Sequence, residues 1–321
     1  MLKYSVRKLL AMIPKMFVVT VILFFFLEIS PGDPVSRMLG PEAYNRMPEP
    51  LIEAYRESLG LNRPAVIRYF TWLWDLLHGN LGYSMSTGQP IAEMLAMRMP
   101  YSMELNFSAL VLSGIIGVVV GFLCAVFQRT PIDYLGSGIS VLGVSMPDYF
   151  FAIIFMLFFS VTLGWFPTGG RMPSDVANPT LWQRLPYMVL PIGSMTFTMT
   201  CGLVRETRTL MVGIMNKDYI KTARAKGLTE FTINVKHVLR NTMSPLLSAM
   251  ISRLPALFGG SIVIEQVFNY IGLGQLSLNA SKLLDAPVCL FNITLTAVVT
   301  LVASTLMDIA VAAFDPRVRF E

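Results

Sequence analysis

The residue types that most often carry catalysis or hold metals are scarce and scattered in this sequence. Its two histidines, His78 and His237, lie far apart, and its three cysteines show no spacing typical of a metal site or a disulfide framework. No lysine follows a glycine anywhere in the chain, so a phosphate-binding loop of the form G-x-x-x-x-G-K-[S/T] is absent. The sequence therefore predicts no metal site and no ATP hydrolysis by this chain itself.

Four ionisable residues lie inside or near the ends of long apolar runs, where charge is costly and usually has a function. Asp148 and Arg253 lie within such runs, and Glu265 and Asp308 lie near the ends of others. Arg253 needs compensation, which we expect from a partner subunit, a carboxylate such as Asp148, or a water-filled cavity. Asp148 and Arg253 are therefore candidate pore residues, and a purely structural ion pair is the alternative.

A compact basic segment, KDYIKTARAKGL, occupies residues 217–228, and five of its twelve residues are charged. Asp218 favours the start of a helix, while Ala223 and Ala225 favour its continuation and leave little side-chain bulk. Gly227 favours a stop. The segment therefore predicts a short protruding helix with small side chains at its tip, surrounded by cations.

A second helix is predicted to start near Thr229 and to return toward the apolar runs. It would place Phe231, Val235 and Val238 on one face, because they are spaced at i, i+4 and i+7. The resulting hairpin could enter a groove on another protein and transmit its movement. The alternative is a patch that binds anionic lipid through its cations.

The rest of the chain has the composition of a membrane protein. Of its 321 residues, 54% are hydrophobic and 14% are charged, below the roughly 25% of soluble domains. Six runs approach or exceed the ~20 residues that cross a bilayer as a helix. These are residues 9–30, 105–127, 134–166, 186–204, 242–264 and 286–307. The first could be a cleaved signal peptide, but its length and its SPGDP ending favour a retained anchor.

Lysine and arginine residues predict the orientation of the six helices. Fifteen lie before or near the start of the first run, in the second and fourth loops and after the last run, and nine lie in the other, longer loops. Because cytoplasmic loops carry the excess of these cations, both termini and residues 217–228 are predicted to be cytoplasmic.

The longest loop, residues 31–100, is then external. Apolar residues at Tyr69, Leu73, Leu76 and Leu77 recur at helical spacing, which predicts one or two short helices near the outer surface. Long loops are often functional, so we expect this segment to meet an external partner, with a simple connecting loop as the alternative. The candidate contacts are the aromatic residues Trp72, Trp74 and Tyr83.

Nine short motifs, in chain order, resemble those of the oligopeptide/dipeptide/nickel permease family of ATP-binding-cassette importers. DYIKTARAKGL resembles the EAA loop of these permeases. The other eight are SPGDP (30–34), GNLGYS (79–84), RMPYSMEL (98–105), GVSMPDYF (143–150), FPTGG (166–170), VLPIG (189–193), EQVFNYIGLGQL (265–276) and DPRVR (315–319). Two departures concern Ile271, where the family usually has proline, and Asp148, where an apolar residue is common. Both put the substrate in doubt rather than the coupling mechanism.

The resemblance implies an all-α integral membrane protein with six transmembrane helices of the type I importer permease kind. Its parts would be a cytoplasmic tail and first helix (1–30), an external segment (31–100) and a permease core (101–321) that contains a cytoplasmic coupling loop (205–245). The residues that would couple to an ATPase are Asp218, Tyr219, Thr222, Ala223, Arg224, Ala225, Lys226, Gly227 and Leu228.

The resemblance also implies partners and a location. The partners would be a second homologous permease, two cytoplasmic ATPase subunits that carry ATP and Mg²⁺, an extracytoplasmic substrate-binding protein and the lipid of a bacterial inner (plasma) membrane, with no cofactor or nucleic acid bound by this chain. Short peptides would be the substrate, with nickel or another metal chelate as the alternative. An ATP-independent secondary transporter would predict ionisable residues along the spans and an internal repeat, and the sequence shows neither.

Overall fold

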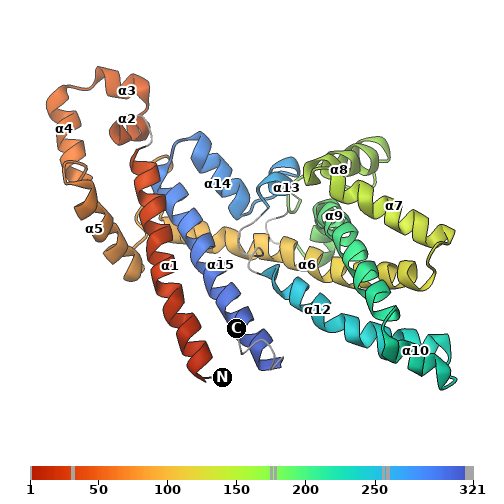
Figure 1. Ribbon diagram of the computed structural model, residues 1–321. Coiled ribbons are helices and arrows are strands. Elements are labelled where there is room, and N and C mark those ends of the chain that lie inside the picture. Colours follow the sequence, from red (N-terminus) through yellow and green to blue (C-terminus); the bar gives the residue numbers. More distant parts are fainter. Residues whose placement is uncertain are drawn as a thin grey trace. The chain divides into compact units, whose positions relative to one another are not determined.

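The computed structural model describes residues 2–29, 33–173, 176, 179–254, 257 and 261–314 (Figure 1). Secondary structure in these residues is helical, apart from an isolated bridge between Tyr83 and Pro90. The motif DPRVR and the first three residues of SPGDP lie outside them. The chain divides into two compact units, and each is described separately. Unit 1 comprises Met1–Ser102, Phe258–Ile262 and Gly272–Glu321, and unit 2 comprises Met103–Leu257 and Val263–Ile271.

Among the described residues, four single helices are long and apolar enough to cross a membrane. They coincide with the first, second, fourth and sixth predicted spans. The four are α1 (Leu2–Glu28), α6 (Ile91–Val126), α9 (Leu181–Met215) and α15 (Ala286–Phe314).

The third predicted span is bent rather than straight. It consists of α7 (Pro131–Ser145) and α8 (Asp148–Phe155), and a π-helical segment, η1 (Met156–Thr162), continues α8. The bend is 107°. It falls at Met146, which precedes a proline and is extended, with φ −103° and ψ 145°. The ring of the following proline disfavours helical geometry at this residue, so the helix ends there.

The fifth predicted span is not a continuous helix in the described residues. Helix α12 (Arg240–Ile251) ends well before residue 264, and α13 (Ile262–Val267) is a separate short helix. Residues 255, 256 and 258–260 lie outside the described part. The count of six spans therefore stays a prediction.

The segment of unit 1 that was predicted to be external forms four helices before α6 begins, instead of the expected one or two. They are α2 (Pro34–Leu39), α3 (Pro41–Arg46), α4 (Glu49–Ser58) and α5 (Ala65–Leu77). Helix α5 lies along α1, where the Tyr69 hydroxyl is 2.9 Å from Thr20 Oγ1 (Figure 1). Leu73 and Leu76 also pack into the interior of unit 1. Leu77 is 73% exposed, so the predicted apolar face of α5 ends at Leu76 instead of Leu77.

A buried carboxylate holds the loop of residues 84–87 against the start of α15. Asp285 Oδ2 accepts hydrogen bonds from Ser84 Oγ (2.6 Å), Ser86 Oγ (2.7 Å) and the Ser86 backbone N–H (3.0 Å), and Oδ1 accepts one from the Met85 N–H (3.2 Å). Burial alone would raise the pKa of Asp285, but the donors outweigh it and hold the pKa below its ordinary value of 3.8. The loop therefore depends on the ionised carboxylate.

We expect Asp285→Asn to loosen this loop. The side-chain amide of asparagine would present its own N–H donors to hydroxyl and backbone N–H groups that already act as donors. The folded-state pKa is lowered, so the stabilisation is present above pH 3.8 and is lost as the pH falls through the lower folded value. Hydrogen exchange of residues 82–90, corrected for intrinsic rates, would show faster exchange in the variant at pH 7 and in the wild type only at strongly acidic pH. Equal protection in both proteins at pH 7 would contradict the assignment.

In unit 2, helices α6 and α9 approach closely because glycines line their contact. A Cβ atom added to Gly117 would lie 2.6 Å from the Leu203 Cβ. One added to Gly121 would lie 2.6 Å from the Thr207 Cβ and 2.9 Å from the Val204 carbonyl oxygen. These distances are too short for real atoms, so the backbones could not approach this closely with larger residues.

Gly121→Ala is therefore expected to lower the thermal stability of the assembled protein, because a backbone oxygen in its way cannot rotate aside. Overpacking of this kind costs about 1–3 kcal/mol. Gly138→Ala in α7 is the matched control, since its added Cβ meets nothing within 4 Å. Melting curves in one detergent should separate the two variants, and equal melting temperatures would refute the close approach.

Candidate functional site

The basic segment forms a short helix whose ends were predicted from local residues. Helix α10 (Asp218–Ala225) follows the extended Lys217. Gly227 ends it with φ +79°, a conformation that favours glycine. The Leu228 N–H bonds to the Ala223 carbonyl (3.4 Å) and the Gly227 N–H bonds to the Arg224 carbonyl (2.9 Å), which is the glycine-terminated Schellman cap of a helix. The predicted start at Asp218 and stop at Gly227 are confirmed.

One face of α10 is packed into unit 2. Ile220 is fully buried and Ala223 is 6% exposed. Their cluster includes Ala125 at the end of α6 and Met211 near the end of α9. Ala223 is thus small because it contacts the core, and not because it lies at the tip as the sequence suggested. The packing fixes α10 to the two long helices.

The hairpin also has exposed aromatic and cationic side chains. Tyr219 is 49% exposed and Phe231 is 76% exposed. Aromatic side chains are enriched at protein–protein interfaces, so these two rings are candidates for contact with another subunit. The other predicted coupling residues that are exposed are Asp218, Thr222, Arg224, Ala225, Lys226, Gly227 and Leu228.

The second arm departs from the predicted periodicity. After α11 (Glu230–Thr232) the chain forms a π-helical segment, η2 (Ile233–Leu239). Ile233 and Val238, five residues apart, are its fully buried apolar residues, as expected when hydrogen bonds run from i to i+5. The predicted buried face of Phe231, Val235 and Val238 is wrong, because it assumed 3.6 residues per turn.

An ion pair joins the two arms at the surface. Arg224 Nε lies 2.7 Å from Glu230 Oε1, and Arg224 Nη2 lies 3.2 Å from Glu230 Oε2. The hydrogen bond from Arg224 lowers the pKa of Glu230. Both side chains are largely exposed, so the pair contributes at most about 1 kcal/mol. The buried cluster, rather than this pair, holds the hairpin in place.

A buried carboxylate joins α7 to α9 above the hairpin. Asp133 is 3% exposed and accepts hydrogen bonds from Arg208 Nε (2.6 Å) and Nη2 (2.8 Å). It also accepts from Ser137 Oγ (3.1 Å) and from the backbone N–H of Arg129 (2.9 Å), which has a left-handed φ of 60°. This bidentate pair was not predicted from the sequence. Two opposite charges near the ends of apolar runs were its only signal.

The two candidate pore residues, Asp148 and Arg253, do not form the ion pair that was one of the expectations. Arg253 Nη2 lies 3.7 Å from Glu206 Oε2 on α9, and both side chains are 35% exposed. Asp148 is exposed as the first residue of α8, where the helix dipole favours a carboxylate. Glu206, not Asp148, is therefore the carboxylate near Arg253.

Two other charged residues from the apolar runs lie in different settings. Glu265 is fully buried, and Asp308 Oδ2 lies 2.7 Å from Lys8 Nζ. Across the described part of the chain, no three His, Cys, Asp or Glu side chains gather closely enough to hold a metal ion.

The three aromatic candidates for external contact differ in placement. Trp72 packs inside unit 1, with ring centroids 5.7 Å from Phe24 and 5.6 Å from Phe291. Trp74 and Tyr83 are exposed. The surface available to an external partner therefore includes the last two and not Trp72.

Comparison with known proteins identifies the family of this chain. Residues 117–320 match the family described as binding-protein-dependent transport system inner membrane component, and residues 1–106 match its N-terminal counterpart. The chain is 33% identical, over 321 residues and the full length of both proteins, to the oligopeptide transport system permease protein AppB of Bacillus subtilis (strain 168).

The same identity and coverage hold for the glutathione transport system permease protein GsiC of Escherichia coli (strain K12). In fold, the chain resembles an inward-facing structure of the MetNI methionine ABC transporter, with a TM-score of 0.56 and 20% identity over 71% of this chain and 99% of that one. The chain belongs to the family of inner membrane components of binding-protein-dependent transport systems.

Proposed function

We propose that this chain forms half of the translocation pore of an ATP-binding-cassette importer for short peptides. It would pair with a second, homologous permease and take substrate from an extracytoplasmic binding protein. Two cytoplasmic ATPase subunits, carrying ATP and Mg²⁺, would supply the energy. Both termini and the α10 hairpin would face the cytoplasm of a bacterial cell whose inner (plasma) membrane the chain crosses several times.

One observation carries the coupling part of this proposal. The α10 hairpin packs Ile220 and Ala223 into a cluster that includes the ends of α6 and α9, and it leaves Tyr219 and Phe231 exposed. A rigid element with packed apolar side chains and exposed aromatic ones is suited to transmit a push from a docked subunit. The proposed coupling residues remain the nine predicted from the sequence between Asp218 and Leu228, without Ile220 and Lys221, and Phe231 is added to them.

The proposed cycle follows from differential binding. ATP closes the two ATPase subunits, their movement shifts α10, and α9 moves with it because Ile220 and Ala223 pack against Met211. The cavity would then open toward the binding protein, and hydrolysis would reset it. ATP must bind the outward-facing assembly more tightly than the inward-facing one, since a ligand without such preference shifts no equilibrium.

Peptide is the proposed substrate because AppB and GsiC carry the names of an oligopeptide and a glutathione permease. Both relatives match over their full length. A metal-chelate importer of the same architecture is the alternative from the sequence, and these names do not favour it. Arg253 and Glu206, which form a half-exposed pair in unit 2, would lie along the path of the substrate.

Uptake by the complete transporter in proteoliposomes tests the proposal. With the binding protein present and ATP inside on the ATPase side, we expect uptake of a labelled di- or tripeptide and no uptake of a nickel chelate. Uptake that proceeds without ATP would instead support a secondary transporter, and uptake of the chelate alone would overturn the peptide assignment.

A further inference from the structure

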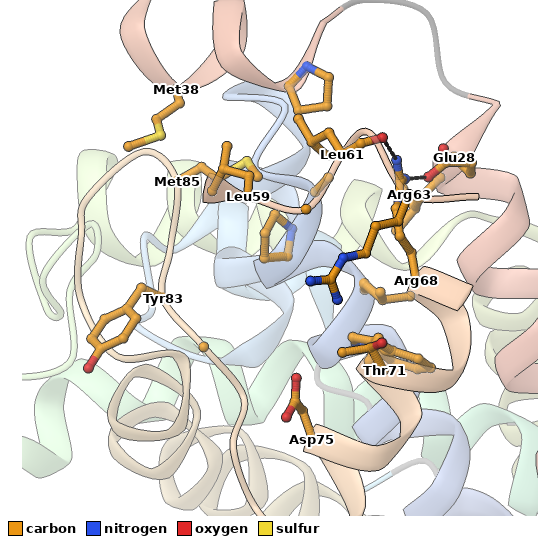
Figure 2. Close-up of a pocket in the computed structure, with 18 of the residues that line it drawn as sticks. Glu28, Met38, Leu59, Leu61, Arg63, Arg68, Thr71, Asp75, Tyr83 and Met85 are labelled. Atoms are coloured by element: carbon orange, nitrogen blue, oxygen red, sulfur yellow. Dashed lines mark hydrogen bonds and ion pairs between the residues drawn. The ribbon is translucent and has the colours of Figure 1, made fainter. Parts of the chain in front are cut away.

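A cavity of about 970 Å³ lies within unit 1, in the segment proposed to face outside (Figure 2). Its walls come from the end of α1, the turn that joins α4 to α5, one face of α5, residues 80–85 and the start of α15. Its size falls in the range of about 300–1,000 Å³ that is typical of small-molecule sites. None of the residues assigned to coupling or to the pore lines it.

The cavity is mostly apolar. Hydrophobic side chains from all its walls line it, among them Phe24, Met38, Leu59, Leu61, Trp72 and Leu290. An apolar hollow with a few polar groups is the usual design of a site for a small molecule that carries both kinds of surface. Its polar groups therefore decide which molecule fits.

Two of the ion pairs at its edge are already satisfied within the protein. Arg68 bonds to Glu28 and to the Leu61 carbonyl oxygen (3.1 Å), as Figure 2 shows. Arg56 Nη2 lies 2.5 Å from Asp33 Oδ2. These contacts tie α5 to α1 and α4 to α2. They stabilise the walls of the cavity, and the charges of these two pairs are balanced within the protein.

Three further charged residues, Glu57, Arg63 and Asp75, line the same hollow. Figure 2 shows the side chains of Arg63 and Asp75 directed into it, with the guanidinium group above the carboxylate. Within the ranges that the structure describes, neither side chain has a hydrogen bond or ion pair, with each other or with a third residue. Arg63 is exposed and Asp75 is partly exposed, so water hydrates both groups in the free protein, and a ligand that carries both charges would replace that water.

Local backbone structure positions the two residues that carry these charges. Gly60 has a φ of +67° and accepts a hydrogen bond from the Arg63 N–H (3.2 Å), which turns the chain between α4 and α5 and brings Arg63 over the cavity. Asp75 lies on the face of α5 that also presents Thr71 and Trp72, at spacings of four and three residues. The two groups are therefore carried by rigid elements.

We propose that this cavity is a peptide-binding site of the permease itself, with the peptide's terminal carboxylate at Arg63, its terminal ammonium at Asp75 and its apolar side chains against the walls. The forked donors of arginine suit a carboxylate, and a carboxylate suits an ammonium group. The inference rests on the proposed peptide function. The site would hold peptide on the external side, before it enters the pore.

The test measures binding of labelled leucyl-leucine and tri-leucine to the complete permease–ATPase assembly without the binding protein. Three forms of each peptide are compared: free, with an amidated carboxyl end, and with an acetylated amino end. Each blocked form should bind the wild type about tenfold or more weakly, as for the loss of a hydrogen bond to a charged group.

The variants assign each end of the peptide to one residue. Arg63→Met should bind the free and amidated peptides equally yet still discriminate against acetylation, and Asp75→Asn should show the reverse. A merely structural defect would weaken all three forms together. Arg46→Gln and Glu42→Gln are the matched controls, because both residues are exposed in the same segment and neither lines the cavity. Both controls should bind as the wild type does.

Four results would overturn the proposal: no saturable binding to the wild type, equal binding of blocked and free peptides, no change in either variant, or displacement of peptide by short-chain phosphatidylethanolamine, whose headgroup also carries both charges. Uptake by the complete transporter separates this failure from failure of the proposed function. If the wild type imports peptide but the cavity does not bind it, only this inference falls.

Discussion

Loss of two exposed aromatic rings, in the double variant Tyr219→Ser with Phe231→Ser, is expected to reduce ATP-driven uptake by more than tenfold. Neither ring belongs to the buried cluster that holds the hairpin, so the fold should survive. Buried aromatic anchors contribute about 2 kcal/mol or more each to a protein interface, which is roughly thirtyfold in affinity. Binding of the ATPase subunits to the permease in detergent should weaken in parallel with uptake.

Two controls separate docking from folding. Trp182→Ser removes an equally exposed ring at the start of α9, far along the helix from the hairpin, and should leave uptake unchanged. Ile220→Ser empties a fully buried position and should lower both the melting temperature and uptake. If the double variant retains full uptake with ATPase affinity unchanged, the hairpin's exposed face is not the docking surface.

Asp133→Ala is expected to destabilise the protein more than any surface substitution. It removes the acceptor of four hydrogen bonds and leaves the Arg208 guanidinium beside an apolar interior without its partner. Removal of one member of a buried pair costs about 3–5 kcal/mol, and the partial exposure of Arg208 puts our expectation near the lower figure. Thermal unfolding of the purified assembly measures the change.

The double variant Asp133→Asn with Arg208→Met tests the cause. It removes both charges but keeps an acceptor for the Arg129 N–H, so most of the lost stability should return. If it is as unstable as Asp133→Ala, the free charge on Arg208 is not what destabilises the single variant.

Features that depend on neighbours in sequence were predictable. The start of α10 at Asp218 and its stop at Gly227 follow from local preferences, and the long apolar runs follow from composition. The bend at Met146 also had a local signal, because a residue before proline avoids helical geometry. The span prediction ignored that signal in favour of hydrophobicity, and so expected a straight helix.

Features that depend on distant packing were not predictable. The π-helical segment that begins at Ile233 changes which side chains of the second arm are buried, and no local sequence pattern predicts it. Arg253 has Glu206 as its neighbour because α12 packs on α9, a contact between segments some fifty residues apart. Likewise, Ala223 was expected to be a tip residue, since a sequence cannot say which face of a short helix the core will cover.

We propose that nucleotide-driven movement enters this chain through the α10 hairpin. The most direct measurement places a photoreactive benzoylphenylalanine at Ala225, which is exposed on that hairpin, and at Gln128 near the end of α6 as a comparison. The account predicts that illumination of the assembled transporter joins permease to ATPase from position 225, with an efficiency that changes when ATP is added. A crosslink to the ATPase from position 128 alone, with none from 225, would contradict it.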